Sequence, residues 1–336
     1  MGIAAYRSAA RGVLIVLVAA ACQTAAPAPV TTPAPLPTVT GAARGEAAFV
    51  IASITGIIAL DRDGRPVGSL IAIPAQTFAA TPALRPDGRQ LAFALTSLAP
   101  GTPNGFGSDI VVANVDGSGM EKIVSHEQAN TFYSGPAYDP TGQFVYFQRR
   151  ASVTRDGVPV NDDAIERFDL RTRERTRVLA DGTDPTVSPD GRTLVYVHLA
   201  KGLVDALWTA DIDGKNARPF LKVRDRFYYV QTPRFAPTGC QIVFSGAGRS
   251  VRGDSAGGHL AHLGVPSELY LSPCDGSSVL TIGETYDDVA PVWSADGTRV
   301  AYALGGAVSI LTVATREVKR LAQTDVFSYG DVVWLR

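Results

Sequence analysis

One short pattern recurs five times along the chain and limits its fold more than any other feature. Each copy has a proline, a short gap, a turn of Pro or Ala, Asp or Thr, and Gly, and then an apolar run rich in β-formers. The copies begin at Pro82, Pro136, Pro185, Pro233 and Pro291. They recur roughly every 50 residues, a period that is typical of repeat architectures.

The residue types in the repeat predict a hairpin. In residues 186–197, TVSPDGRTLVYV, the proline presets φ, the oxygen of Asp190 can cap the turn, and Gly191 accepts a positive φ. We expect this turn to close a short hairpin with a bulge. The run at 194–197 is apolar on both faces, which is typical of a strand that lies between two sheets.

A second set of polar turns lies between the copies, at residues 115–119, 170–174, 212–216, 274–278 and 313–317. Each repeat therefore contains four strands, joined by the first turn, a loop and the second turn. Four antiparallel strands in every repeat of about 50 residues are the pattern of a β-propeller blade. No long helical periodicity is present, so we expect an all-β chain.

The repeats resemble those of TolB-type β-propellers, in which a Ser-Pro-Asp-Gly turn precedes an Ile/Val-Ala-Phe/Tyr strand. The copy with Ser188 to Gly191 shows the turn, and the resemblance covers nearly all of residues 47–336. It extends to the propeller alone, because the chain has no room for the separate N-terminal domain of TolB. The resemblance implies a role in protein–protein contact.

The two ends of this region predict a closed ring. Residues 47–71 supply three strands of a blade without its innermost strand, and YGDVVWLR at 329–336 resembles an innermost strand, with Trp334 matching Trp293. Together they form one shared blade, which removes the open edges of the sheet. We therefore predict a six-bladed propeller over residues 45–336, with the first blade closed by the C-terminal strand. The alternative is an open sandwich of irregular repeats.

The first 44 residues differ from the rest. Arg7 and Arg11 precede an apolar run at 13–21 that is too short to span a bilayer, as in a secretory signal peptide. Small residues then lead to Cys22, which resembles a bacterial lipobox and implies lipidation of Cys22 after removal of residues 1–21. Residues 22–44 form an Ala/Pro/Thr-rich linker. The alternative is an ordinary signal with an incidental cysteine.

These features predict an exported protein that is lipid-anchored at the bacterial cell envelope, at the outer membrane or in the periplasm if the cell has two membranes. The two remaining cysteines fit this compartment. Cys240 begins one strand of a repeat and Cys274 ends the neighbouring strand, so an antiparallel pairing would bring them close enough for a disulfide. We predict the Cys240–Cys274 bond; the alternative is two buried thiols.

Three long loops, at 96–109, 150–163 and 245–267, join the second and third strands of their repeats and lie on one face. The turns on the opposite face are short and uniform, which suggests a structural role. Extra loop length on one face indicates binding. The candidate contacts on this long-loop face are Arg155, Asp162, Asp163, Arg252, His259 and His262.

The central channel opens on the long-loop face, where each innermost strand begins. The candidate residues at this mouth are Thr81, Asp184, Thr232 and Asp331, with Asp287 and Asp288 slightly farther out. Asp184 and Asp331 would make the mouth acidic and suited to a cation or a basic group. The alternative is that these carboxylates bond to neighbouring backbone amides.

Several functional classes are disfavoured. The net charge of -1 carries no basic surplus, so nucleic acid is not an expected partner. The chain lacks a G-x-S-x-G elbow and nucleotide-binding glycine motifs, and His259 and His262 lack a third metal ligand. We expect a non-catalytic chain without catalytic residues, cofactor or bound metal.

The sequence therefore predicts a monomeric binding module, anchored to the membrane, that contacts an envelope protein or polymer through its long-loop face. The alternative is a carbohydrate-active propeller enzyme that works at the channel mouth. Some propellers with similar repeats are oligogalacturonate lyases, which hold a metal with several histidines, and this chain has four histidines in all.

Overall fold

The computed structural model describes residues 45–97, 104–222, 227–248, 267–285, 287–324 and 331–335. The predicted signal peptide, Cys22 and the whole linker lie outside the described residues, as do Arg252, His259 and His262. All described residues belong to one compact unit of the chain, Pro35–Arg336.

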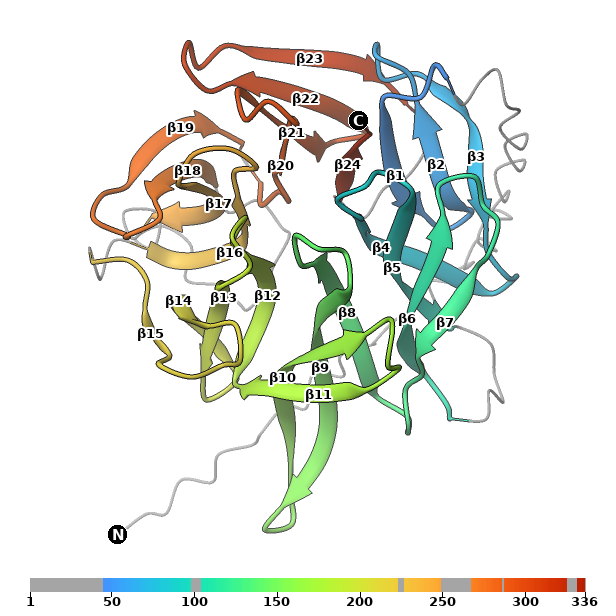
Figure 1. Ribbon diagram of the computed structural model, residues 1–336, viewed down its shortest axis with the longest axis vertical. Helices are drawn as coiled ribbons and strands as arrows, with labels where there is room; N and C mark the ends of the chain where they lie inside the picture. The colour runs from blue at the N-terminus through green and yellow to red at the C-terminus, as the bar shows by residue number, and fades with distance from the viewer. Residues whose placement is uncertain are drawn as a thin grey trace, which may run out of the picture. The chain divides into compact units, whose positions relative to one another are not determined.

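The described chain is all-β, as predicted, and its sheets are arranged in a ring around a centre (Figure 1). No helix that could cross a lipid bilayer is found among the described residues. Four sheets have four antiparallel strands each. Their strands are β24 (Val332–Trp334) with β1 (Phe49–Ser53), β2 (Gly56–Leu60) and β3 (Pro66–Ala72); β12 (Gly182–Val187), β13 (Thr193–Ala200), β14 (Leu203–Asp211) and β15 (Arg218–Pro219); β16 (Phe227–Phe235), β17 (Gln241–Gly248), β18 (Glu268–Pro273) and β19 (Leu280–Glu284); and β20 (Val292–Trp293), β21 (Arg299–Leu304), β22 (Ala307–Thr312) and β23 (Val318–Gln323).

A fifth sheet has eight strands. It contains β4 (Thr77–Leu84), β5 (Gln90–Ser97), β6 (Gly107–Asn114), β7 (Glu121–Val124), β8 (Thr131–Tyr138), β9 (Phe144–Arg155), β10 (Val158–Asp169) and β11 (Arg175–Ala180). Its two antiparallel halves, β4–β7 and β8–β11, are joined by one parallel pair, Gly107 with Thr131. The propeller is thus confirmed, with four separate four-stranded sheets and one eight-stranded sheet, and the count of six blades stays a prediction.

The repeated turns have the predicted chemistry. All five turn glycines have positive φ, from 69° to 74°. The N–H of Gly297, for example, donates to the carbonyl of Ser294 at 2.9 Å, and Asp296 Oδ1 accepts from the N–H of Thr298 at 3.0 Å. Local residue types therefore account for the hairpin that opens these repeats.

The C-terminal strand closes the ring, as predicted. β24 pairs with β1 in antiparallel register, and Trp334 lies opposite Phe49. The two rings are 5.1 Å apart between centroids. Val332 and Val333 are each 4% exposed, so the short strand is held by packing as well as by its backbone bonds.

The hydrophobic core lies between neighbouring sets of strands. Six clusters of buried side chains are present among the described residues, and each combines strands that are consecutive around the ring. Ile58 of β2 and Ala301 of β21, for example, share one cluster across the closure. Each sheet is therefore covered on both faces, which is why its strands read as continuous apolar runs.

The predicted disulfide is confirmed. Cys240 and Cys274 are bonded across the start of β17 and the end of β18, with their Cα atoms 5.2 Å apart. The N–H of Cys274 also donates to the carbonyl of Cys240 at 3.1 Å. The bond closes a loop with a sequence separation of 34, which includes the long connection between the two strands.

We predict that removing this bond lowers the stability of the fold. The double variant Cys240→Ser, Cys274→Ser is expected to lose about 3 kcal/mol in the free energy of unfolding, because the unfolded chain regains the freedom of the closed loop. Urea unfolding of the variant and of the oxidised protein measures the loss. Equal midpoints for the two proteins would contradict the prediction.

Candidate functional site

Four of the innermost strands, β4, β8, β12 and β16, share an unusual backbone conformation at the residue before their proline. Thr81, Gly135, Asp184 and Thr232 have φ values of +50°, +58°, +49° and +47°. The pairing of each strand with the next shifts register at this point, as in a β-bulge. A left-handed β-branched residue is costly, so the surrounding contacts must hold Thr81 and Thr232 in place.

These contacts run from one innermost strand to the next. The N–H of Gly135 donates to Thr81 Oγ1 at 3.1 Å, and the N–H of Thr232 donates to Asp184 Oδ2 at 3.3 Å. Thr232 Oγ1 in turn donates to the carbonyl of Val289 at 3.1 Å. An isolated parallel bridge then joins Ala290 to Asp331.

Thr81, Asp184, Thr232 and Asp331 thus lie in one ring of contacts between the innermost strands, where the sequence predicted a channel mouth. We call this ring of residues the inner girdle. Asp184 has the alternative role that the sequence left open, because its carboxylate accepts a backbone N–H. Asp287 Oδ1 likewise accepts from the N–H of Asp288 at 2.9 Å.

The carboxylates of Asp184 and Asp288 also influence the partly buried phenol of Tyr229. Burial raises the pKa of Tyr229, and the negative charges of Asp184 and Asp288 raise it further. No group of three His, Cys, Asp or Glu side chains that could hold a metal ion is found in the part of the chain that the structure describes.

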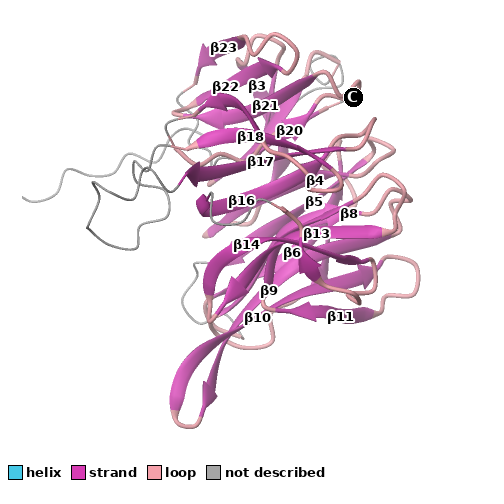
Figure 2. Ribbon diagram, turned by 90° about the vertical axis from the view of Figure 1, so that its left-hand side faces the viewer, coloured by secondary structure: helices cyan, strands magenta, loops and turns pink. Residues whose placement is uncertain are grey.

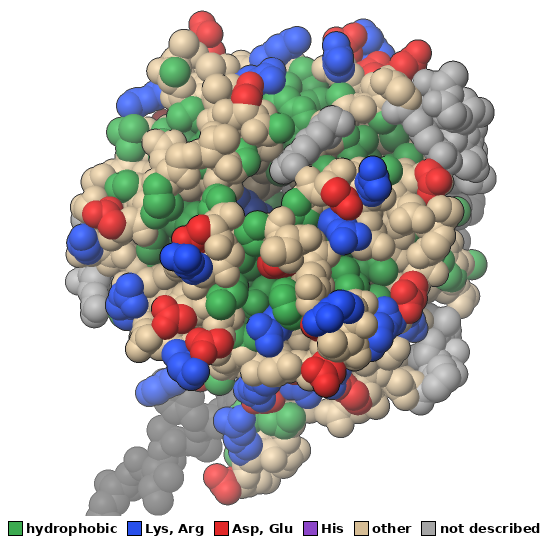
Figure 3. Space-filling model, viewed as in Figure 1, with side chains coloured by type: hydrophobic (Ala, Val, Ile, Leu, Met, Phe, Trp, Pro, Cys, Tyr) green, Lys and Arg blue, Asp and Glu red, His purple; other side chains and the backbone are tan. Residues whose placement is uncertain are grey.

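A cavity of about 440 Å³ lies at the centre of the ring. Most of its lining residues follow the girdle position in β4, β8, β12, β16, β20 and β24, on the side of the short turns, and Asp331 of the girdle also lines it. Figures 1 and 3 view this face, and Figure 3 shows it hollowed at the centre with hydrophobic side chains around the hollow. Charged groups also reach the cavity, among them Arg234, Asp296, Arg299 and Asp331.

Sequence reasoning missed this cavity, since it assigned the short-turn face a structural role. Of the six predicted channel residues, Asp331 is the one that lines the cavity. The periodic prolines mark the innermost strands, but periodicity alone does not show which half of a channel stays open.

The segment at 150–163 differs from the expected loop. β9 and β10 each have twelve residues and pair in continuous register from Arg155 and Val158 to Phe144 and Asp169. A two-residue turn joins them, with φ of +51° at Asp156 and +78° at Gly157. The Asp-Gly pair between alternating apolar and polar residues is a strong hairpin signal, and it explains why this segment is a paired hairpin and not an open loop.

This hairpin projects from the body of the propeller on the side opposite the short turns (Figures 1 and 2). Pairing with β8 ends at Ala151, and pairing with β11 ends at Ala164. Residues 152–163 therefore form a two-stranded ribbon that extends past both neighbouring strands. The predicted residues Arg155, Asp162 and Asp163 all lie on it.

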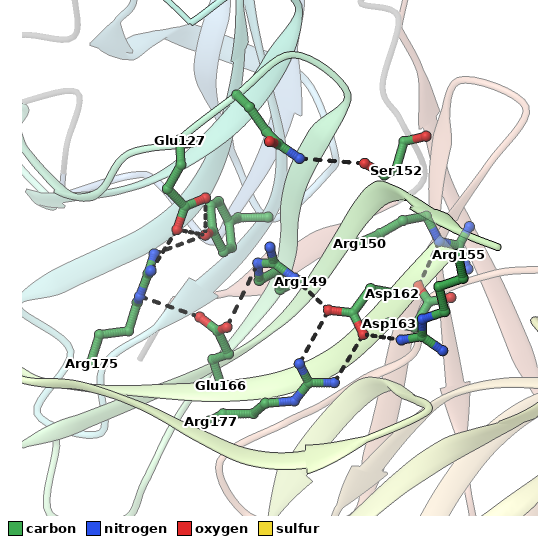
Figure 4. Close-up of polar contacts among 12 residues, drawn as sticks. Glu127, Arg149, Arg150, Ser152, Arg155, Asp162, Asp163, Glu166, Arg175 and Arg177 are labelled. Carbon is green, nitrogen blue, oxygen red and sulfur yellow. Dashed lines mark hydrogen bonds and ion pairs between the residues drawn. The ribbon is translucent and has the colours of Figure 1, made fainter. Parts of the chain in front are cut away.

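Arginines surround the carboxylate of Asp162 at the base of the ribbon (Figure 4). Arg149 Nη1 lies 3.0 Å from Oδ2, and Arg155 Nη2 lies 3.2 Å from Oδ1. Arg177 donates to both oxygens, at 3.1 and 3.2 Å. On the other face of the ribbon, Arg150 Nε donates to Asp163 Oδ1 at 2.6 Å.

A second carboxylate continues this network toward the neighbouring strands. Glu166 is 7% exposed, and its carboxylate lies 3.8 Å from Arg149 Nε and 3.5 Å from Arg175 Nε. Arg175 also pairs with Glu127, which accepts from the hydroxyl of Tyr133 at 2.9 Å. Arg175 and Arg177 of the run RTRERTR at 171–177 thus belong to this network.

The pKa values of these two carboxylates, Asp162 and Glu166, are shifted in opposite directions. The hydrogen bonds from Arg177 lower the pKa of Asp162. The positive charge of Arg177 and the hydrogen bond and charge of Arg149 lower it further. Burial raises the pKa of Glu166 and outweighs the opposing charges of Arg175 and Arg149. Glu166 Oε2 also accepts no hydrogen bond from the described residues, which leaves its charge poorly compensated.

Comparisons with known proteins identify the fold and not the function. No protein-family profile and no curated protein sequence matches the chain. Solved structures do match. TolB from Acinetobacter baumannii has a TM-score of 0.60 at 16% identity over 86% of this chain, and this chain covers 66% of that protein, less than two thirds.

Two further structures agree in fold. A putative TolB from Agrobacterium tumefaciens has a TM-score of 0.54 at 18% identity, over 75% of this chain and 87% of that one. Hydrazine synthase from Kuenenia stuttgartiensis has a TM-score of 0.59 at 13% identity, over 88% and 48%. Proteins of different function share this architecture, so the likeness shows a TolB-like β-propeller fold and leaves the function to the site itself.

We predict opposite pH dependences for variants of the two carboxylates. The pKa of Asp162 is lowered by folding, so its stabilising contribution is present above the unfolded pKa and is lost as the pH falls. Asp162→Asn should therefore cost about 2 kcal/mol at neutral pH and progressively less in acid. The pKa of Glu166 is raised, so its contribution is present at low pH and is lost as the pH rises.

Glu166→Gln should accordingly become more stable relative to the parent protein between about pH 4 and about pH 7. Urea unfolding of the parent and the two variants across this range measures both trends. Parallel pH profiles for Asp162→Asn and Glu166→Gln would refute the assignment.

Proposed function

We propose that the chain is a non-catalytic binding module of a bacterial cell envelope, held at the membrane by a lipid on Cys22. It contacts an envelope protein or polymer through the long-loop face, where the β9–β10 hairpin projects. The projecting hairpin is the observation that carries this proposal.

The hairpin is built for contact with a large partner. A two-stranded ribbon is marginally stable alone, but here the arginine network fixes its base to β11 and to the preceding strands. Its tip is exposed, with Arg155 at 65% and Val158 at 59%. A rigid projection of this kind cannot enclose a small substrate, since small-molecule sites are concave.

The residues before the propeller support a tether. The Ala/Pro/Thr-rich linker at 22–44 favours extended polyproline conformations and would span roughly 70 Å at most. The disulfide supports an oxidising compartment, as expected of an exported protein. A propeller on such a spacer could reach partners some distance from its own membrane.

We predict that shortening the hairpin abolishes partner capture. Residues 152–161 are replaced by Asn-Gly, which joins Ala151 to Asp162. These two residues lie opposite each other in the same kind of pair as Arg155 and Val158, so the turn geometry is preserved. Crosslinking in intact cells of the source organism compares the variant with the parent chain.

A band captured by the parent and lost from the shortened variant is the expected result. The control carries Arg171→Glu on the opposite face and should capture the band normally. Thermal unfolding checks that the variant keeps its fold. An unchanged band pattern from the shortened, folded variant would remove the hairpin from the binding face and with it the proposed function.

The lipid anchor gives a separate prediction. Growth with a clickable fatty acid should label the parent protein and leave Cys22→Ser unlabelled, because the lipid is attached at that thiol. The labelled parent should partition into detergent. An unlabelled parent protein that fractionates with the soluble proteins would show that Cys22 is incidental to an ordinary signal.

A further inference from the structure

The projecting ribbon has two unlike faces. Side chains of paired residues point to the same face of a sheet, and faces alternate along a strand. The pairs Val160 with Val153 and Val158 with Arg155 thus share the face that carries Asp162. The other face holds Ser152, Thr154, Pro159 and Asn161.

The first of these, the valine face, has the pattern of a surface that is covered in use. Alternation of apolar and polar residues is typical of strands with one packed face and one solvated face. Val158 is nevertheless 59% exposed, and Val153 and Val160 are only partly buried. Three valines on an element that extends into solvent lower solubility unless a partner covers them.

The backbone edges of the ribbon are less suited to a partner than this face. The N–H of Ser152 donates to the carbonyl of Asn130 at 3.2 Å, and its carbonyl accepts from Gln128 Nε2 at 3.3 Å. On the other edge, Pro159 has no N–H to donate. Addition of a further strand is therefore hindered on both edges, and contact by side chains is favoured.

Arginine side chains border the valine face. Arg149, Arg155 and Arg177 all lie within 3.2 Å of the one carboxylate of Asp162. Arg149 is shared with Glu166, but Arg155 and Arg177 pair with no other carboxylate among the described residues. Their side chains are 65% and 45% exposed, so their remaining donors can reach a ligand.

We infer that the valine face binds an extended protein segment that carries apolar side chains between acidic ones. The apolar side chains lie on Val153, Val158 and Val160, and the carboxylates pair with Arg155 and Arg177. An acidic polysaccharide fits less well, because the valines would desolvate its hydroxyl groups without hydrogen-bonding them. This inference rests on the proposed function and names the chemistry of its partner.

The test uses a phage-displayed library of random peptides of about eight residues, long enough to cover the ribbon at roughly 3.3 Å per residue. The full exported chain is the target, and the shortened-hairpin variant removes unrelated binders. Enrichment of peptides with alternating apolar residues and excess Asp or Glu is expected. Recovery of no hairpin-dependent peptide, or of peptides without an acidic excess, would overturn the inference.

Fluorescence anisotropy of the most enriched peptide then tests each part of the face. Val158→Thr with Val160→Thr, which keeps shape and β-propensity, should weaken binding about tenfold. Arg155→Glu should weaken it about tenfold, whereas Arg171→Glu on the opposite face should leave it unchanged. Wild-type affinity in the valine or Arg155 variants would overturn the inference.

Polygalacturonate, an acidic polysaccharide, is tested as the alternative class of ligand. If it binds in a hairpin-dependent way and the valine substitutions do not affect that binding, the partner is an acidic polymer and the peptide inference fails. If the shortened hairpin loses its partner in cells but the peptide experiments fail, the proposed function stands without this inference. If capture in cells survives shortening of the hairpin, both fall.

Discussion

Closure of the ring is the constraint on which the rest of the structure depends. β24 pairs with β1, so the first and last described strands form one sheet. Without this pairing, β1 would present an open edge and the cluster around Phe49, Ile51 and Val332 would lose one wall. Since every sheet packs between two neighbours, an opening at one interface would loosen the support of the others.

Closure also explains the strained inner girdle. Left-handed residues before proline persist only where surrounding contacts hold them. Thr81 and Asp184 each accept a backbone N–H from the next innermost strand, so the strain at one strand is coupled to the placement of another. The girdle lies between the two sides of the propeller, with the cavity on the short-turn side and the projecting hairpin on the other.

The hairpin combines two physical properties that binding requires. Its base is fixed by ion pairs between arginines and carboxylates. The pKa of Asp162 is lowered, so its charge is well compensated by the arginines, whereas burial raises the pKa of Glu166 and leaves its charge less well compensated. Its tip is exposed and presents valines beside arginines. Rigid placement lowers the entropy lost on association, so affinity can come from a small contact area.

The amino-acid sequence was enough to predict the blade pattern, the turn conformations, ring closure by the C-terminal strand and the Cys240–Cys274 bond. These features depend on residues within one repeat or on recurrence of the same motif, which local rules capture. Three features became visible only in the folded chain: the side of the channel that is hollow, the paired ribbon at 150–163, and the contacts of Arg175 and Arg177 with Glu166 and Asp162. Such contacts join different strands whose side chains share a face only after register and packing are set, and no single segment carries that information.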